Sequence, residues 1–348
     1  MSRGNGVHSP LNGALESAVS LVRNGHKFLL TCHVMPDADA LGSMLGLAEV
    51  LRELGKEVVL YNRDPVPPQL RFLPGSDAVG SVLPVGGRFD ATFVTDTAAR
   101  TLLPRHFPER TITGPIVIVD HHVAHDDYGD VVLRDPNACA TAIVVLELAA
   151  ALGVHPMPPL AAAPLYTALV ADTGGFRYPG TTAQTLRTAA DLLDTGIDPW
   201  QVASHVFEGW SMARMRLLGL AINSIQTEFG GRVAVVSMPL EMLDQVGATD
   251  DMAEGLVEYG RMLKGVEISI MLWERRARSD ETMDGSPFTR MSLRSSGVAD
   301  VSRVAVTMGG GGHRAAAGAT VKLDLKSARD RIVEAAGQEL DSQRDSLV

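Results

Sequence analysis

Residues 115–122 read PIVIVDHH, in which four β-branched residues run directly into an acid and two histidines. An apolar run of this kind, without alternating polar residues, predicts a strand over 115–119 that is buried on both faces of a sheet. Asp120 then stands at the carboxyl end of that strand. The same arrangement recurs upstream at two more expected strand ends: 27–32 before His33 and 91–95 before Asp96.

Helical patterns separate these strands. Apolar residues recur at helical spacing over 15–24 and 40–54, and a further strand is expected over 57–61. Buried strands that alternate with helices predict an α/β fold whose first domain holds a parallel sheet covered on both faces. Ligands of such sheets collect at the carboxyl edge of the strands. The acids and histidines that follow the three strands are therefore expected at one edge.

The second half of the chain has a different order of expected helices and strands. Helices come first, expected over 139–152, 161–171, 182–195 and the long amphipathic stretch 199–226. Strands and helices then mix: strands over 232–238, 267–274 and 289–295, a helix around 252–263, a glycine run, another strand, and a terminal helix over 327–340. We therefore expect a catalytic domain over 14–196, a helical connector over 197–228 and a smaller α/β domain over 229–342.

Composition limits the possible partners. The 348 residues carry a formal net charge of −10 and only 5% aromatic residues, which argues against duplex DNA and against stacking along a long single strand. A small phosphorylated substrate needs only a few local cations. Two cysteines, Cys32 and Cys139, are typical of buried thiols in a reducing compartment. Residues 1–13 lack the apolar centre of a signal peptide, and no apolar stretch is long enough for a bilayer. We expect a soluble, cytoplasmic protein without a membrane partner.

Four short segments carry acids and imidazoles: His33-x-x-x-Asp37-x-Asp39, Asp96, Asp120-His121-His122, and Asp172-Thr173-Gly174. A single acid at a strand end is more often a cap or turn residue. Together, however, these carboxylates would repel one another at one sheet edge without a counter-charge. Oxygen and imidazole ligands favour Mn²⁺, and also Mg²⁺, Fe²⁺ or Co²⁺, over a thiolate zinc site. Two such ions sharing one carboxylate would activate water for phosphoester hydrolysis without a protein nucleophile.

In order, spacing and placement, these four segments resemble motifs I to IV of the DHH phosphoesterase superfamily, over about residues 15–187. The second domain resembles the DHH-associated domain, with MSLRSS at 291–296 and GGGGHRAAAG at 309–318. The resemblance is greatest to the compact group of oligoribonucleases (nanoRNases) that are also phosphoadenosine-phosphate phosphatases. Some members of that group also act on cyclic di-AMP or its linear product.

The resemblance implies a role for each residue of the four segments. His33 and Asp37 would hold one divalent ion, most consistent with Mn²⁺. The other ion would be held by Asp39, His121 and Asp172, with Asp96 as the bridge. Asp120 would orient an imidazole, and His122 would face the substrate phosphate as a hydrogen-bond donor or an acid. The residues expected to bind the nucleotide are Arg294, Ser295, Gly310, Gly311 and His313.

The roles of two further residues, Arg177 and His125, are not decided by the sequence. Arg177, five residues past Asp172, is either a phosphate contact or a solvated loop residue. The histidines outside the four segments lack partners at ligand spacing and are expected to be structural or exposed. Among them His125, close to the triplet, is the one to revisit.

The leading hypothesis is a hydrolase of short nucleotides, acting in a cleft between two domains and forming a homodimer through first-domain helices or the connector, as the resemblance implies. It would release 5′-mononucleotides from short RNA or pApA, and remove the 3′-phosphate of phosphoadenosine phosphate (pAp). A catalytically silent nucleotide-binding regulator is the alternative from another class, but no expected acid is missing. Within the superfamily an inorganic pyrophosphatase is the rival, and the glycine-rich loop argues against it. The ranking of pAp, pApA, cyclic di-AMP and longer RNA stays open.

Overall fold

The computed structural model describes residues 11–83, 86–104, 107–123, 125–126, 128–276, 288–296, 299–312 and 314–345. The chain divides into two units, residues 1–209 and 210–348, and each has its own sheet and core. In the described part of the chain, no helix has the length and apolar character needed to cross a membrane. Each unit is considered separately below.

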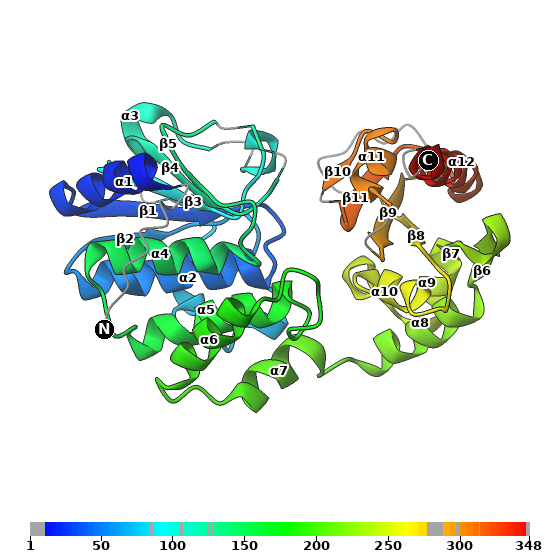
Figure 1. The fold of residues 1–348 in the computed structure, drawn as a ribbon, viewed down its shortest axis with the longest axis horizontal. Coiled ribbons are helices and arrows are strands. Elements are labelled where there is room, and N and C mark those ends of the chain that lie inside the picture. The colour runs from blue at the N-terminus through cyan, green and yellow to red at the C-terminus, as the bar shows by residue number, and fades with distance from the viewer. Residues whose placement is uncertain are drawn as a thin grey trace. The chain divides into compact units, whose positions relative to one another are not determined.

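A parallel sheet of five strands forms the centre of the first unit (Figure 1). Its strands are β1 (Lys27–Cys32), β2 (Glu57–Leu60), β3 (Ala91–Thr95), β4 (Ile116–Asp120) and β5 (Val131–Arg134). Their order is β2-β1-β3-β4-β5, and every neighbouring pair is parallel. The parallel sheet expected from the sequence is confirmed, and the ends of β1, β3 and β4 share one edge.

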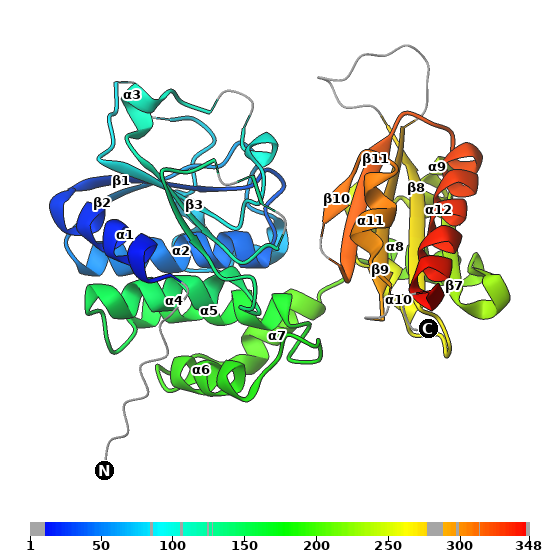
Figure 2. The same ribbon diagram turned by 45° about the horizontal axis from the view of Figure 1, so that its top comes forward.

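Helices cover one face of this sheet in two layers (Figure 2). The helices of the unit are α1 (Asn12–Asn24), α2 (Ala38–Glu53), α3 (Arg110–Thr113), α4 (Thr141–Leu152), α5 (Pro159–Asp172), α6 (Ala183–Leu193) and α7 (Pro199–Phe207). Helices α1, α2 and α4 pack on the strands, and α5 packs on α2. Loop residues such as Leu103, Phe107 and Phe89 cover the opposite face. The sheet is therefore buried on both sides, as its apolar strands require.

Two glycines let α2 and α5 approach closely. A Cβ atom on Gly42 would lie 2.4 Å from the carbonyl oxygen of Pro164, and one on Gly46 would lie 2.4 Å from Leu165. Larger residues would push the helices apart. The close approach matters for function, because α2 begins at the candidate site and α5 ends there.

The second unit is built on a mixed sheet. Its strands are β6 (Gln226–Glu228), β7 (Val233–Met238), β8 (Ile268–Arg275), β9 (Phe288–Ser295), β10 (Gly311–Gly312) and β11 (Ala316–Val321). They lie in the order β10-β11-β9-β8-β7-β6, with β7 and β8 parallel and the other pairs antiparallel. The helices are α8 (Met212–Asn223), α9 (Leu240–Val246), α10 (Val257–Arg261), α11 (Val301–Val306) and α12 (Leu325–Asp345). One face packs on α11 and α12, and the other on α8, α9 and α10.

The stretch expected to be one helical connector differs from that expectation in detail. It forms two helices, α7 and α8, separated by Gly209, which adopts a φ of 74° that favours glycine. Ser211 then caps α8 by accepting a hydrogen bond from the Arg214 N–H at 3.1 Å. Gln226 lies in β6 rather than in a helix. The two helices belong to different units, while the domain boundaries given above stay predictions.

Candidate metal centre

The acids and histidines expected at one sheet edge do come together there. His33 follows β1, Asp96 follows β3, and Asp120 ends β4 with His121 and His122 directly behind it. Two more acids arrive from helices, since Asp39 lies in the first turn of α2 and Asp172 ends α5. The described residues contain three overlapping groups whose potential ligand atoms lie within 4.8 Å of one another, and all three are built from these side chains.

One group consists of His33, Asp37 and Asp96. The Nε2 atom of His33 lies 3.9 Å from Oδ1 of Asp37 and 3.7 Å from Oδ2 of Asp96. The other ring nitrogen, Nδ1, lies 2.9 Å from the carbonyl oxygen of Val34, which fixes the ring and leaves Nε2 as the coordinating atom. Asp37 also caps α2 by accepting a hydrogen bond from the Ala40 N–H at 3.0 Å.

The other group consists of Asp39, His121 and Asp172. The Nε2 atom of His121 lies 3.7 Å from Oδ2 of Asp39 and 3.6 Å from Oδ2 of Asp172. Its Nδ1 atom lies 3.1 Å from the carbonyl oxygen of Ala138, so Nε2 again faces the carboxylates. Strands and helices that are far apart in sequence therefore deliver three potential ligands to one point.

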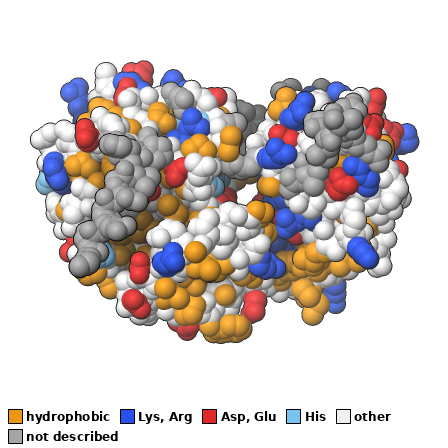
Figure 3. All heavy atoms as spheres, in the orientation of Figure 1, with side chains coloured by type: hydrophobic (Ala, Val, Ile, Leu, Met, Phe, Trp, Pro, Cys, Tyr) orange, Lys and Arg blue, Asp and Glu red, His pale blue; other side chains and the backbone are white. Residues whose placement is uncertain are grey.

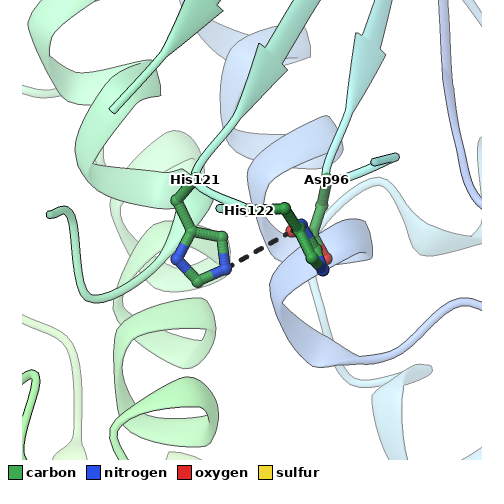
Figure 4. Close-up of side chains that lie close together, drawn as sticks. All are labelled: Asp96, His121 and His122. Atoms are coloured by element: carbon green, nitrogen blue, oxygen red, sulfur yellow. Dashed lines mark ion pairs between the residues drawn. The ribbon is translucent and has the colours of Figure 1, made fainter. Parts of the chain in front are cut away.

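Asp96 belongs to both sides of the centre. Its Oδ2 faces His33, whereas its Oδ1 lies 3.7 Å from Nε2 of His121. Figure 4 shows this carboxylate, from the end of β3, beside the two imidazoles that follow β4. The backbone of Asp96 has a φ of 52°, in the left-handed region that is costly for a residue with a Cβ. Backbone strain of this kind concentrates at functional sites, and here it turns a carboxylate toward both groups.

Thr141, at the start of α4, positions two of these acids and was not anticipated from the sequence. Its backbone N–H donates to Oδ2 of Asp39 at 2.7 Å, and its hydroxyl donates to Oδ1 of Asp96 at 2.8 Å. Ser43 donates a further hydrogen bond to Asp39 at 3.0 Å. All four side chains are buried. The only signal in the sequence was a threonine near the start of an expected helix, where such residues are common caps.

Three carboxylates of the centre are difficult to ionise in the metal-free protein. Burial raises the pKa of Asp39 to about 7. The side chain of Asp172 is 38% exposed, but its partial burial and the nearby Asp39 raise its pKa to about 7. Burial also raises the pKa of Asp96 to about 6, although the nearby His122 opposes the rise. For His33 burial lowers the pKa, but the adjacent carboxylates outweigh it and hold the pKa above 6.5. These shifts express an excess of negative charge in a buried place, which a divalent cation would neutralise.

Comparison with known proteins places the chain in a family. The profile described as "DHH family, N-terminal domain" matches residues 27–169. The bifunctional oligoribonuclease and PAP phosphatase NrnA of Thermus thermophilus is 35% identical over 318 residues, which cover 89% of each chain. The protein of the same name from Bacillus subtilis is 28% identical over 296 residues, covering 84% of this chain and 88% of that one.

The chain belongs to the DHH family. The resemblance drawn from the sequence motifs is thereby confirmed, and with it the assignment to the phosphoesterases. A crystal structure of an exopolyphosphatase-related protein from Bacteroides fragilis has the same fold, with a TM-score of 0.84 and 23% identity over 96% of this chain and 98% of that chain.

In this DHH protein the triplet itself forms a compact turn around Asp120. Oδ1 of Asp120 accepts hydrogen bonds from the backbone N–H groups of His121 at 2.6 Å and His122 at 3.0 Å. The same oxygen lies 2.7 Å from Nδ1 of His122. Burial would raise the pKa of Asp120, but the hydrogen bond from His122 and the nearby ring of His125 hold it far below its usual value. Asp120 is therefore an anion that orients imidazoles, and its carboxylate does not belong to any of the three ligand groups.

His122 points its second nitrogen away from this anion. Its Nδ1 is engaged by Asp120 and lies 3.4 Å from Oδ1 of Asp96. Burial lowers the pKa of His122, but the bond to Asp120 and the charge of Asp96 raise it to about 9. His122 also belongs to the third ligand group, with Asp96 and His121. The ring is a proton donor in the metal-free protein at neutral pH.

Not every expected substrate residue presents a free group. The side chain of Arg294 donates to Oε1 of Glu258 at 2.8 Å, so a phosphate would have to compete with that carboxylate. Ser295 is 1% exposed and lies on the opposite face of β9 from Arg294, because side chains alternate along a strand. Arg177 is exposed and donates to the carbonyl oxygen of Gly174 at 2.5 Å. The substrate roles of these residues stay predictions.

The glycine run forms an edge strand of the second unit. A Cβ atom on Gly310 would lie 2.1 Å from the carbonyl oxygen of Gly318, so a side chain there would collide with β11. A Cβ atom on Gly311 would meet no atom of the described residues within 4 Å. Packing also demands a glycine at position 312, where a Cβ atom would lie 2.5 Å from the carbonyl oxygen of Ala316, but it does not explain Gly311. His313 lies outside the described residues.

Proposed function

We propose that this chain is a metal-dependent phosphoesterase that cleaves short oligoribonucleotides into 5′-mononucleotides and removes the 3′-phosphate of phosphoadenosine phosphate. The relatives from T. thermophilus and B. subtilis bear names that describe both activities, and the similarity extends over most of each chain. The observation that carries the proposal is the placement of Asp96, whose two oxygens face two separate groups of potential ligands.

The donor set fits a pair of divalent cations. His33, Asp37 and Asp96 would hold one ion, and Asp39, His121 and Asp172 would hold the other, with Asp96 shared. Carboxylate oxygens with some imidazole suit Mn²⁺, and also Mg²⁺ or Co²⁺. Such ions would supply positive charge to the phosphate oxygens and lower the pKa of a water molecule. The raised pKa values of the buried acids support a site that needs this charge.

His122 then donates a proton to the leaving oxygen. In pApA the bond from phosphorus to the ribose 3′ oxygen breaks, and the oxygen of water forms the new bond to phosphorus. The 3′ oxygen takes a proton from Nε2 of His122, and the water releases a proton to solvent, from which His122 is reprotonated. Asp120 holds Nδ1 of the same ring, so the imidazole cannot turn. Each turnover consumes one water and yields two molecules of AMP.

The second unit would bind the terminal nucleotide. Arg294 offers a guanidinium at the end of β9, and at Gly311 an added Cβ atom would meet no described atom within 4 Å. Backbone N–H groups in glycine-rich loops contact phosphates closely. His313 and Ser295 complete the set expected from the sequence, and Arg177 adds a cation in the first unit. Cyclic di-AMP belongs to the proposed substrates because it contains the same phosphodiester.

The test is hydrolysis of pApA with Mn²⁺ by the wild-type protein and by Asp120→Ala and His121→Ala. Both variants are expected to lose at least 100-fold in kcat/KM, since one loses a ligand and the other loses the anion that orients His122. The matched control is His155→Ala, an exposed histidine outside the site. Full activity in either site variant contradicts the assignment. Inorganic pyrophosphate in the same assay tests the rival activity, and binding of pAp without turnover would indicate a silent regulator.

A comparison of kcat/KM on pAp, pApA, cyclic di-AMP and a five-residue RNA ranks the substrates. The homodimer, the exclusion of duplex DNA and the cytoplasmic location stay predictions. For the homodimer, hydrophobic side chains gather along the lower edge of the first unit in Figure 3, the edge formed by α6 and α7 in Figure 1. Leu186 on α6 and Trp200 on α7 are 51% and 66% exposed, which supports an interface on these helices.

A further inference from the structure

A second histidine lies behind the triplet, on the side of Asp120 away from His122. The Nε2 atom of His125 lies 3.3 Å from Oδ2 of Asp120, and both side chains are fully buried. The two oxygens of one carboxylate therefore face two different imidazoles, His122 on Oδ1 and His125 on Oδ2. The proposed reaction uses His122 and gives His125 no role.

His125 is held in place by contacts that reach back to the end of β3. Its ring stacks on Tyr128, with a centroid distance of 5.8 Å and an angle of 5° between the planes. The Tyr128 hydroxyl donates to the carbonyl oxygen of Thr97 at 3.0 Å, and Thr97 directly follows Asp96. The backbone N–H of Asp126 donates to the carbonyl oxygen of Ala98 at 2.9 Å. Tyr128 and Asp126 therefore link His125 to the residues that directly follow Asp96, the shared carboxylate.

We propose that His125 is a positioning residue for His122 and acts through Asp120. The inference rests on the proposed function. Oδ1 of Asp120 takes three contacts, from two backbone N–H groups and from the His122 ring, and keeps them only while the carboxylate does not rotate. His125 holds the second oxygen and blocks that rotation. Without it, Oδ2 would be buried facing no imidazole, and the carboxylate would turn toward water or another donor.

Loss of His125 should slow one step of the reaction, the transfer of a proton from His122 to the leaving oxygen. If the carboxylate turns, the ring of His122 loses its fixed orientation, and delivery of the proton to the ribose 3′ oxygen slows. The ligand groups are less affected, because His125 faces Asp120, whose carboxylate belongs to none of the three groups. Loss of His125 should therefore lower kcat and leave KM and the affinity for Mn²⁺ nearly unchanged. A purely structural role would instead lower kcat, raise KM and weaken the binding of Mn²⁺ together.

A change of leaving group isolates this step. The p-nitrophenyl ester of AMP also yields AMP, but its leaving oxygen departs as an anion and needs no proton. For His125→Ala we expect kcat on pApA to fall about 10- to 100-fold, while kcat on the p-nitrophenyl ester changes less than threefold. His125→Gln places an amide nitrogen near the former Nε2 and should restore most of the activity on pApA. Melting temperature and Mn²⁺ affinity are measured for every variant.

A double-mutant cycle with His122→Ala supplies the second measurement, and it remains decisive if the ester proves a poor substrate. Because His125 acts through His122, adding His125→Ala to His122→Ala should lower kcat on pApA no further. Equal losses on pApA and on the ester, additive losses in the cycle, or wild-type activity of His125→Ala would each overturn the inference. If the wild-type protein hydrolyses neither substrate with Mn²⁺, the proposed function fails first.

Discussion

Replacing Asp96 by Asn should make the metal-free protein more stable while removing its response to metal. Asp96 is 3% exposed, and burial raises its pKa from 3.8 to about 6. At neutral pH the ionised carboxylate therefore destabilises the folded, metal-free protein by about 3 kcal/mol. An asparagine keeps the oxygen that accepts the Thr141 hydroxyl at 2.8 Å, and an incompletely paired amide N–H costs about 1 kcal/mol. The net gain is about 2 kcal/mol.

A gain of this size corresponds to roughly 4–8 °C in the melting temperature of the first unit. Its pH dependence has a definite sign. The folded-state pKa is raised, so the penalty in the wild-type protein is absent below pH 3.8, grows as pH rises toward about 6, and is complete above that. The advantage of Asp96→Asn should follow the same course. Calorimetry in EDTA at several pH values between about 4 and 8 measures it.

Addition of Mn²⁺ should reverse the order of stability. The wild-type protein gains about 3 kcal/mol at a concentration 100-fold above its dissociation constant, whereas the variant has lost the carboxylate shared by both groups. The matched control is Asp191→Asn, which makes the same change of charge on the exposed surface of α6. If Asp96→Asn melts below the wild-type protein in EDTA at pH 7.5, or keeps the wild-type response to Mn²⁺, the account of the site is wrong.

Three further expectations follow from the same contacts. Thr141→Val removes the hydroxyl that orients Asp96 and should weaken Mn²⁺ binding about tenfold by titration calorimetry, with little change in melting temperature. Gly310→Ala should lower the melting temperature, because its Cβ would lie 2.1 Å from a backbone oxygen of β11, whereas Gly311→Ala should leave it unchanged and raise KM for pAp. The affinity for Mn²⁺ should rise between pH 5.5 and 8, about tenfold per pH unit for each proton released, since acids with pKa values near 6 and 7 must lose protons to bind it.

The first unit could be predicted well from the sequence because its strands are buried on both faces. Such strands are continuous apolar runs, and parallel pairing then sends their carboxyl ends to one edge. The short strand β5 was missed, since Val131–Arg134 offers four residues and no clear boundary. The break between α7 and α8 was readable in principle from Gly209 and the capping Ser211, but the amphipathic pattern on both sides concealed it.

The residues of the site also differ in how well the sequence predicts their positions. His33, Asp96 and Asp120 follow strands, so their proximity follows from topology alone. Asp172 ends a helix, so topology alone does not place it; the sequence grouped it with the others as an acid in a short loop motif, and the family resemblance then gave it a role. Thr141 and His125 had only weak signals, a threonine near the start of an expected helix and a histidine close to Asp120-His121-His122. Each acts by a contact across the fold: Thr141 meets Asp39 and Asp96 from the start of α4, and His125 meets Asp120.

The metal centre also explains why the first unit needs so many rigid supports. Asp39 and Asp96 are buried at this edge, beside the exposed Asp37 and Asp172 and the imidazoles of His33 and His121. The raised pKa values of Asp39 and Asp96 measure how poorly the edge tolerates charge without cations. A flexible site would relieve the repulsion by moving the acids apart, and the ligand groups would be lost. Close packing of α2 on α5 through Gly42 and Gly46 opposes that movement, as do the bonds from Thr141. The folded chain therefore keeps the geometry that cations require before they bind, at a cost in stability that cation binding offsets.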